Sequence, residues 1–139
     1  EIGSGLVGSE MCIRDRYEPE AVVLAGYMRL LGPTFIKPYE YKILNIHPAL
    51  LPSFPGLHAQ GQAVAAGVKV SGCTVHFVDT GMDSGPIIMQ AVVPVYADDT
   101  EDTLAARILP EEHKTYKKAL ALFCEDKLSI KNHIVHIED

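Results

Sequence analysis

The sequence contains no tryptophan and only three cysteines, which are Cys12, Cys73 and Cys124. Their number is odd, their spacings are wide, and no Cys-x-x-Cys pair occurs. A small disulfide-stapled protein shows an even, closely spaced set instead. We therefore expect reduced, buried thiols in a cytoplasmic protein.

The sequence is also poor in positive charge and in long apolar runs. It has 12 Lys and Arg against 18 Asp and Glu, and its formal net charge is -6. A protein that coats nucleic acid needs a clustered basic surface to neutralise phosphates, so we expect no nucleic-acid partner. No run approaches the roughly 18 apolar residues of a membrane span, so we expect no membrane partner.

What the chain does have is enough apolar material for one ordinary core. It is 139 residues long and 47% hydrophobic. Those values suit a single domain, and they are not the composition of a disordered chain. They leave the oligomeric state open.

The first sixteen residues, EIGSGLVGSEMCIRDR, have no clear hydrophobic period. They lack the basic start and apolar run of a signal peptide. GSGLVG fits a dinucleotide-binding glycine pattern poorly, and no strand precedes it. Leu6 to Arg16 resembles a translated sequencing adapter. We expect a non-native or disordered head at residues 1–16 and one domain at residues 17–139.

Strand-type and helix-type segments alternate from Tyr17 onward, which predicts an α/β fold with a mixed, mostly parallel sheet flanked by helices. The strands are expected at 21–25, 42–46, 71–78 and 86–95, with a late strand or strap at 129–136. A short helix is expected after Gly32, and another over 59–66 with Gly67 as its stop. Thr100 is expected to cap a helix that Pro110 breaks or kinks, followed by a helical segment over 111–125.

Asn45 and His47 are the strongest chemical signal. Positions i and i+2 of a strand point to the same side, so both side chains should project together where the strand ends. Open α/β sheets usually bind ligands at such strand ends. An amide and an imidazole aimed at one point suit oxyanion stabilisation and proton transfer. The alternative is an Asn and a His that only bond the backbone at the start of a loop.

Asp83 is the second signal, within the turn Gly81-Met82-Asp83-Ser84-Gly85. Glycines on both sides allow a backbone to approach a ligand closely. A carboxylate near His47 would favour the charged imidazole. The alternative is an ordinary Asp-Gly turn between two strands.

The other histidines give weaker signals. His76 alternates with apolar residues in a strand and suits a satisfied, partly buried histidine better than a ligand. Together, His47, His76 and Asp83 would have the right atoms for a metal, but the familiar zinc spacings are absent, so we expect no metal. His133 and His136 are expected at the surface.

Four stretches together resemble the phosphoribosylglycinamide formyltransferase family. They are VVLAGYMRLL from Val22, LNIHPALLPSFPGLHA from Leu44, SGCTVHFVDTGMDSGPII from Ser71 and ILPEEHKTY from Ile108. His-Pro-x-Leu-Leu-Pro is shared by folate-dependent formyl-transferring enzymes, and Phe-Pro-Gly-Leu-His is similar to the glycinamide ribonucleotide branch.

The resemblance implies a catalytic group of Asn45, His47 and Asp83 that transfers a formyl group from 10-formyltetrahydrofolate to glycinamide ribonucleotide. It also implies folate-binding residues in two segments and a contact between Glu112 and the ribose side of the nucleotide. The folate-binding residues would be Met28, Arg29, Leu30, Leu31, Asp79, Thr80, Gly81 and Met82.

The family pattern begins with a strand and a glycine-rich phosphate loop that this sequence does not show, which favours an amino-terminally truncated chain. Formyltetrahydrofolate deformylase and a non-catalytic folate-binding fragment stay open as alternatives. Methionyl-tRNA formyltransferase fits less well, because the acidic chain shows no basic RNA-binding extension.

Overall fold

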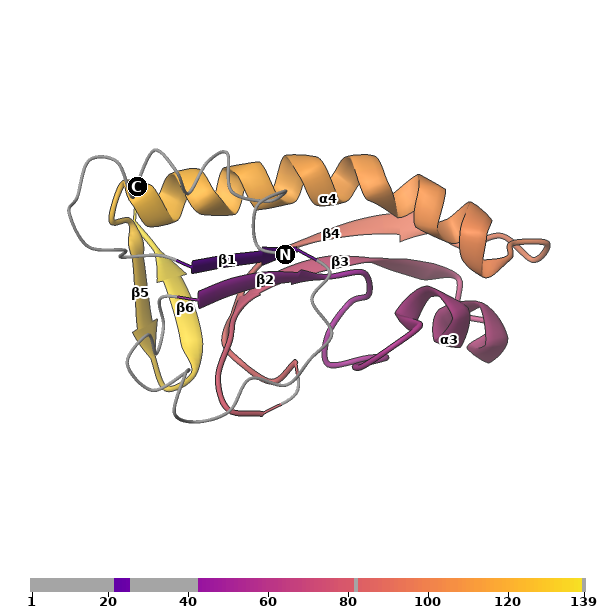
Figure 1. Cartoon of the computed structure of the whole chain (residues 1–139), viewed down its shortest axis with the longest axis horizontal. Helices are drawn as coiled ribbons and strands as arrows, with labels where there is room; N and C mark the ends of the chain where they lie inside the picture. Colours follow the sequence, from indigo (N-terminus) through magenta and orange to yellow (C-terminus); the bar gives the residue numbers. More distant parts are fainter. Residues whose placement is uncertain (1–21, 26–42, 82, 139) are drawn as a thin grey trace.

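The computed structural model describes residues 22–25, 43–81 and 83–138, and of residues 22–25 it describes the backbone. Its centre is a four-stranded sheet in the order β1-β2-β3-β4 (Figure 1). The strands are β1 (Val22–Ala25), β2 (Ile43–His47), β3 (Val70–Phe77) and β4 (Ile87–Pro94).

The sheet is mixed, as the sequence predicted. β1 and β2 are parallel, whereas β2–β3 and β3–β4 are antiparallel. Antiparallel pairs therefore outnumber parallel ones among the described strands. β4 lies at an edge of this sheet and ends at Pro94, a position where a residue without an N–H costs no ladder bond.

Among the described residues, two helices accompany the sheet. α3 (Ala59–Ala66) ends at Gly67, whose φ of 73° lies in the left-handed region, as expected for a helix stop. α4 (Glu101–Cys124) runs along one side of the strands (Figure 1). Neither helix combines the length and apolar character that crossing a bilayer requires.

The sheet has one face for the core and one for the site. Successive strand residues point to opposite faces, so β2 and β3 each divide their side chains between the two. The α4-facing set joins the main hydrophobic core, and the Tyr116 hydroxyl donates to the Leu44 carbonyl at 3.1 Å. That core contains Leu44, Ile46, Cys73, Val75, Phe77, Leu104, Ile108, Ala119 and Leu120, among others.

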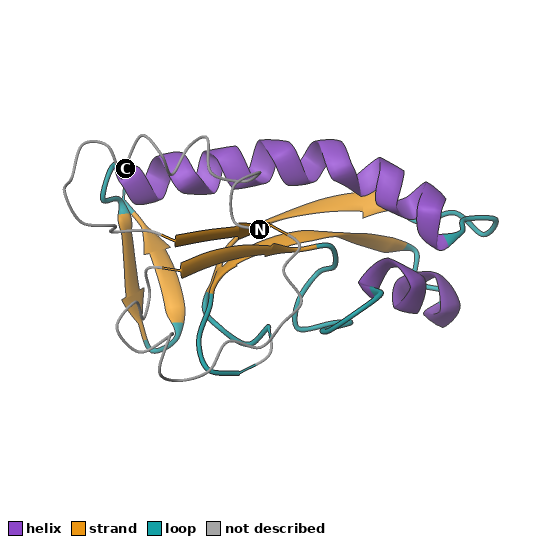
Figure 2. Cartoon of the chain, viewed as in Figure 1, coloured by secondary structure: helices purple, strands orange, loops and turns teal. Residues whose placement is uncertain are grey.

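The long loops lie on the opposite side of the strands from α4 (Figure 2). Asn45 pairs in register with His76, and His47 pairs with Thr74. These four polar side chains are buried on the face that α4 does not cover. The alternation of β2 and β3 thus gives the site an apolar support on the far face of the same two strands.

The break expected at Pro110 does not occur, because α4 is continuous from Glu101 to Cys124. Pro110 and Ala106 are both exposed. Proline removes the bond to the carbonyl four residues earlier, and water can satisfy that exposed carbonyl. Burial of Leu104 and Ile108 on one side of Pro110, and of Tyr116 on the other, keeps the helix on the sheet.

The expected late strand is a hairpin instead, with β5 (Leu128–Lys131) and β6 (Ile134–Ile137). Asn132 and His133 form the two-residue turn with φ values of 54° and 66°. Positive φ at both central residues is the geometry of a tight hairpin turn. β6 contacts β4, which sets the hairpin beside the sheet.

The cysteines follow the expectation only in part. Cys73 is buried as a free thiol, and burial raises its pKa. Cys124 is disulfide-bonded, so the expectation of reduced thiols throughout is wrong.

Asp99 fixes the start of α4. It accepts hydrogen bonds from the two terminal guanidinium nitrogens of Arg107, at 2.7 and 2.8 Å, and from the Tyr96 N–H at 2.7 Å. Thr100 caps the helix within a capping box that includes Thr103, which confirms the predicted cap. The hydrogen bonds from Arg107 hold the pKa of Asp99 well below its usual range.

We predict that Asp99→Asn lowers the melting temperature at pH 7. A depressed carboxyl pKa contributes stability above the unfolded-state pKa, and that stability is lost as pH falls. The difference from wild type should therefore shrink as pH falls below about 4. Thermal melts at several pH values test this, with Asp98→Asn as the neighbouring control. An unchanged difference at low pH would contradict the ionic explanation.

Candidate active site

Asn45 and His47 end β2 and face the side of the sheet away from α4. They are 5% and 1% exposed, and a proline-rich loop follows directly. The predicted strand-end placement is therefore confirmed. Oδ1 of Asn45 is buried without a hydrogen-bond partner among the described residues. Such an atom is uncommon in a folded protein and is suited to meeting a ligand.

His47 has an acceptor at each ring nitrogen. Nε2 donates to the Phe54 carbonyl at 2.7 Å, and Nδ1 lies 3.5 Å from Oδ2 of Asp83. An imidazole can donate from both nitrogens only in its charged form. The alternative, that His47 only bonds the backbone, describes Nε2. It does not explain Nδ1, which faces the Asp83 carboxylate.

Asp83 joins the β3–β4 loop to the proline-rich loop. Its Oδ2 accepts the Gly56 N–H at 2.8 Å, and its side chain is 11% exposed. Its φ of 51° is in the left-handed region, which Asp tolerates better than most residues and which recurs at functional sites. The alternative of an ordinary turn does not explain these contacts across the loops.

The loop that carries Asp83 depends on Gly85. A Cβ there would lie 1.7 Å from the Phe77 carbonyl oxygen, so only glycine fits. Phe77 N–H donates to the Pro86 carbonyl at 2.9 Å. Within the loop, the Asp79 carboxylate accepts from Gly81 N–H and the Ser84 hydroxyl, both at 2.9 Å. These contacts set the direction in which Asp83 leaves the strand.

His76 flanks the other oxygen of Asp83. Its Nε2 lies 3.7 Å from Oδ1 of Asp83 and has no hydrogen-bond partner among the described residues. Its Nδ1 donates to the Phe77 carbonyl at 3.0 Å, which leaves Nε2 as an acceptor. Burial lowers the pKa of His76. The interpretation as a satisfied histidine therefore holds for one nitrogen only.

The structure thus brings Asn45, His47 and Asp83 together and adds His76. Among the residues that the structure describes, no group of three or more His, Cys, Asp or Glu is arranged to hold a metal ion. The arrangement offers an amide, an imidazole held between two acceptors and a carboxylate. Those groups suit charge stabilisation and proton transfer at one point.

Glu112 is not part of this cluster. It lies on α4, which packs on the opposite face of the sheet, and it interacts electrostatically with Cys73 on that face. Burial raises the pKa of its carboxyl. Met28, Arg29, Leu30, Leu31 and Met82 lie outside the described residues, whereas Asp79, Thr80 and Gly81 are in the loop before Asp83.

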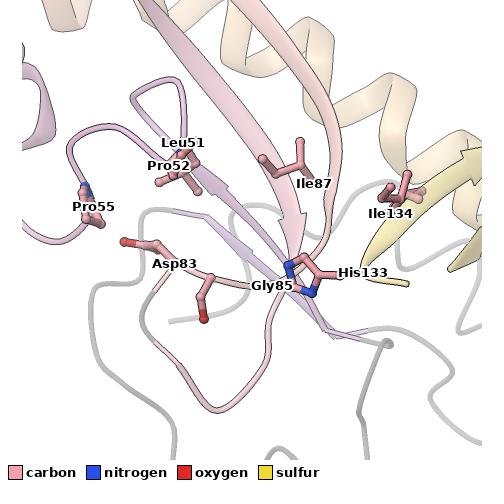
Figure 3. A pocket seen from close by; sticks show the side chains of 10 residues that line it. Leu51, Pro52, Pro55, Asp83, Gly85, Ile87, His133 and Ile134 are labelled. Atoms are coloured by element: carbon pink, nitrogen blue, oxygen red, sulfur yellow. The ribbon is translucent and has the colours of Figure 1, made fainter. Parts of the chain in front are cut away.

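A pocket of about 590 Å³ adjoins Asp83. Figure 3 shows Asp83 on one side of it and His133 and Ile134 of the hairpin on the other. His133 and His136 are exposed, as expected, but no sequence pattern indicated that His133 lies near the site. The remaining lining residues are Leu51, Pro52, Pro55, Ser84, Gly85, Ile87 and Val135.

Side chains from elsewhere hold the loop after His47, and sequence reasoning missed them. Thr74 donates to the Ala49 carbonyl at 2.7 Å, and Gln90 donates to the Leu51 carbonyl at 3.0 Å. Gln62 donates to the carbonyls of Pro55 and Leu57 at 3.1 and 2.8 Å. The available signal was a loop with three prolines, whose carbonyls need donors from outside the loop.

Fold and site together define an α/β protein with an acid–base cluster at the end of an interior strand. The chain belongs to the formyl transferase family, because residues 12–120 match the model of that family. The family resemblance of the sequence and the expected fold class are therefore confirmed.

The chain is similar to phosphoribosylglycinamide formyltransferase of Escherichia coli K12, at 44% identity over 89% of this chain and 58% of that protein. Glycinamide ribonucleotide transformylase 1 from Symbiobacterium toebii is 51% identical with a TM-score of 0.85, over 95% of this chain and 63% of that one. A formyltetrahydrofolate deformylase from Pseudomonas syringae is 32% identical with a TM-score of 0.83, over 94% of this chain and 43% of that one. The chain thus spans less than two thirds of the length of each.

We predict that Glu112→Gln raises the melting temperature at pH 7. A carboxyl pKa raised by burial means that folding disfavours the charged form. Stability is therefore lost as pH rises from the ordinary glutamate pKa through the folded-state value. The gain should vanish near pH 3, where the carboxyl is protonated in both states. Glu111→Gln, at the neighbouring position of the same helix, is the control. Equal effects of the two substitutions would contradict an effect of burial.

Proposed function

We propose that this chain carries the catalytic centre and the folate side of an enzyme that transfers a formyl group from 10-formyltetrahydrofolate to the amine of glycinamide ribonucleotide in purine synthesis. The main support for this proposal is the cluster of Asn45, His47 and Asp83 at the end of β2. Membership in the formyl transferase family and the names of the similar proteins support the same chemistry.

The mechanism follows from where charge develops. When the substrate amine attacks the formyl carbon, negative charge builds on the formyl oxygen. In the proposed route the Asn45 side-chain N–H donates to that oxygen, because both His47 nitrogens already face acceptors. The imidazole of His47 and the carboxylate of Asp83 lie beside this point, with Nδ1 and Oδ2 3.5 Å apart. A water relays the proton from the amine to the leaving nitrogen. This route needs neither a covalent enzyme intermediate nor a metal.

The folate would lie against Met28, Arg29, Leu30 and Leu31 and against the loop from Asp79 to Met82. Oδ1 of Asn45 and Nε2 of His76 have no hydrogen-bond partner among the described residues, so both could accept a hydrogen bond from an N–H group of the bound folate. Glu112 would contact the ribose side of the nucleotide, as the family resemblance implies. Both substrates are small molecules, and we propose the cytoplasm as the location.

Two alternatives have specific support. The similarity to a deformylase favours formyl transfer to water, although the identity there is 32% against 51% for the glycinamide ribonucleotide transformylase. The span of less than two thirds of the similar proteins favours a fragment that binds folate without turnover. A product assay separates these alternatives: it yields formylated nucleotide, free formate, or neither while folate still binds.

We predict that Asn45→Ala lowers formyl transfer by about 10²-fold or more, since loss of a single oxyanion donor has that effect on rate. We expect His47→Ala to lower formyl transfer as well, because it removes the imidazole that lies beside the reacting groups. Circular dichroism should show that both variants remain folded. Wild-type turnover in either variant would rule out the assigned roles.

We also predict saturable calorimetric binding of a stable 10-formylfolate analogue to the 139-residue chain, weakened by Asp83→Ala. Asp98→Ala, which removes an exposed carboxylate outside the site, is the control. Absence of binding by a well-folded chain would contradict the folate assignment.

A further inference from the structure

The segment between His47 and α3 has few backbone hydrogen bonds of its own. Pro52 and Pro55 have no N–H to donate. Among the described residues, the loop backbone bonds to itself through Ser53 N–H and the Leu50 carbonyl at 3.0 Å. The conformation of the segment therefore depends on side chains from outside it.

Three side chains meet at the centre of this segment. His47 donates to the Phe54 carbonyl, and the Gly56 N–H donates to Asp83. Gln62, on α3, donates through Nε2 to the carbonyls of Pro55 and Leu57. The two carbonyls held by Gln62 thus flank the residue whose N–H binds the Asp83 carboxylate.

We propose that Gln62 is a positioning residue for the His47–Asp83 pair and acts through the backbone of residues 54–57. One amide group supplies both protons, so a single side chain fixes the carbonyls on either side of Gly56. Holding the Pro55 carbonyl fixes the peptide that carries the Gly56 N–H, which donates to Oδ2 of Asp83. The Phe54 carbonyl, which accepts from Nε2 of His47, lies one peptide earlier in the same segment. The catalytic consequence of this placement depends on the proposed function, but the placement itself does not.

The backbone at Phe54 needs support from outside the segment. We call the two hydrogen bonds from Gln62 to the Pro55 and Leu57 carbonyls the clamp. The φ of Phe54 is 53°, in the left-handed region, which costs a residue with a bulky side chain about 1 kcal/mol or more. A segment that has such a residue and few bonds of its own would relax if the clamp were lost. Relaxation would carry the Phe54 carbonyl away from His47 and the Gly56 N–H away from Asp83.

Two substitutions remove the clamp in different ways. Gln62→Met keeps the length and helix propensity of the side chain and removes its donors. Gln62→Glu is nearly isosteric and sets a carboxylate against two carbonyl oxygens. Gln60 lies on the same helix and makes neither contact. Gln60→Met and Gln60→Glu are therefore matched controls for composition and charge.

The test uses hydrogen exchange and nitrogen-15 NMR on the whole chain. Exchange of the Gly56 amide should become about five- to tenfold faster in both Gln62 variants, as loss of two modest hydrogen bonds implies. The Nε2–H signal of His47 should shift or broaden, while amides in the centre of β3 keep their wild-type rates. The Gln60 variants should match wild type.

Unchanged Gly56 and His47 signals in the Gln62 variants would overturn the proposal. Equal acceleration at all amides would also overturn it, because that result describes general destabilisation. Where formyl transfer is measurable, Gln62→Met should lower kcat more than it changes KM. If wild type transfers no formyl group, the proposed function fails, and the Gly56 and His47 signals still decide the role of Gln62.

Discussion

The site depends on one carboxylate. Oδ2 of Asp83 accepts the Gly56 N–H at 2.8 Å and faces Nδ1 of His47 at 3.5 Å, so it joins two loops that leave different strands. Among the described residues, Asp83 provides the polar contact between the loop before β4 and the loop after β2. The left-handed backbone at Asp83 and the obligatory glycine at position 85 are the local means by which the chain turns this carboxylate inward.

The sheet supplies the rigid part of the arrangement. β2 and β3 present polar side chains on one face and core side chains on the other, where α4 covers them. Movement of Asn45 or His47 would therefore require repacking against Leu44 and Ile46. Close packing resists such changes, and sites built on strands are held more accurately than sites built on loops. The residues on the loops, such as Asp83 and Gly56, lack this packing and depend on hydrogen bonds from other parts of the chain.

The features that could be predicted from the sequence are those that depend on the local spacing of residues. Asn45 and His47 stand two apart in a strand, so their common direction could be inferred, as could the helix cap at Thr100. Asp83 was found as a candidate from its glycine neighbours, but its contact with Gly56 depends on tertiary structure. Gln62 and His76 were missed or undervalued, because bonds to distant backbone carbonyls and an unpartnered ring nitrogen leave no sequence pattern. The prediction of a break at Pro110 was wrong for a physical reason. Pro110 is exposed, so water can satisfy the carbonyl that it leaves unbonded, and the buried residues on both sides of it keep the helix continuous.

The two histidines beside Asp83 differ in what they can offer it. The bond from Nδ1 of His76 to a carbonyl leaves Nε2 as an acceptor, and burial opposes its protonation. An acceptor facing Oδ1 at 3.7 Å adds no attraction on that side. On the other side, Oδ2 faces a backbone N–H and an imidazole whose far nitrogen donates to a carbonyl. The donors around the carboxylate thus lie on the Oδ2 side, which faces His47 and Gly56. A donor at Nε2 of His76 would offer Oδ1 a hydrogen bond that the acceptor form does not, so the two histidines support the carboxylate unequally.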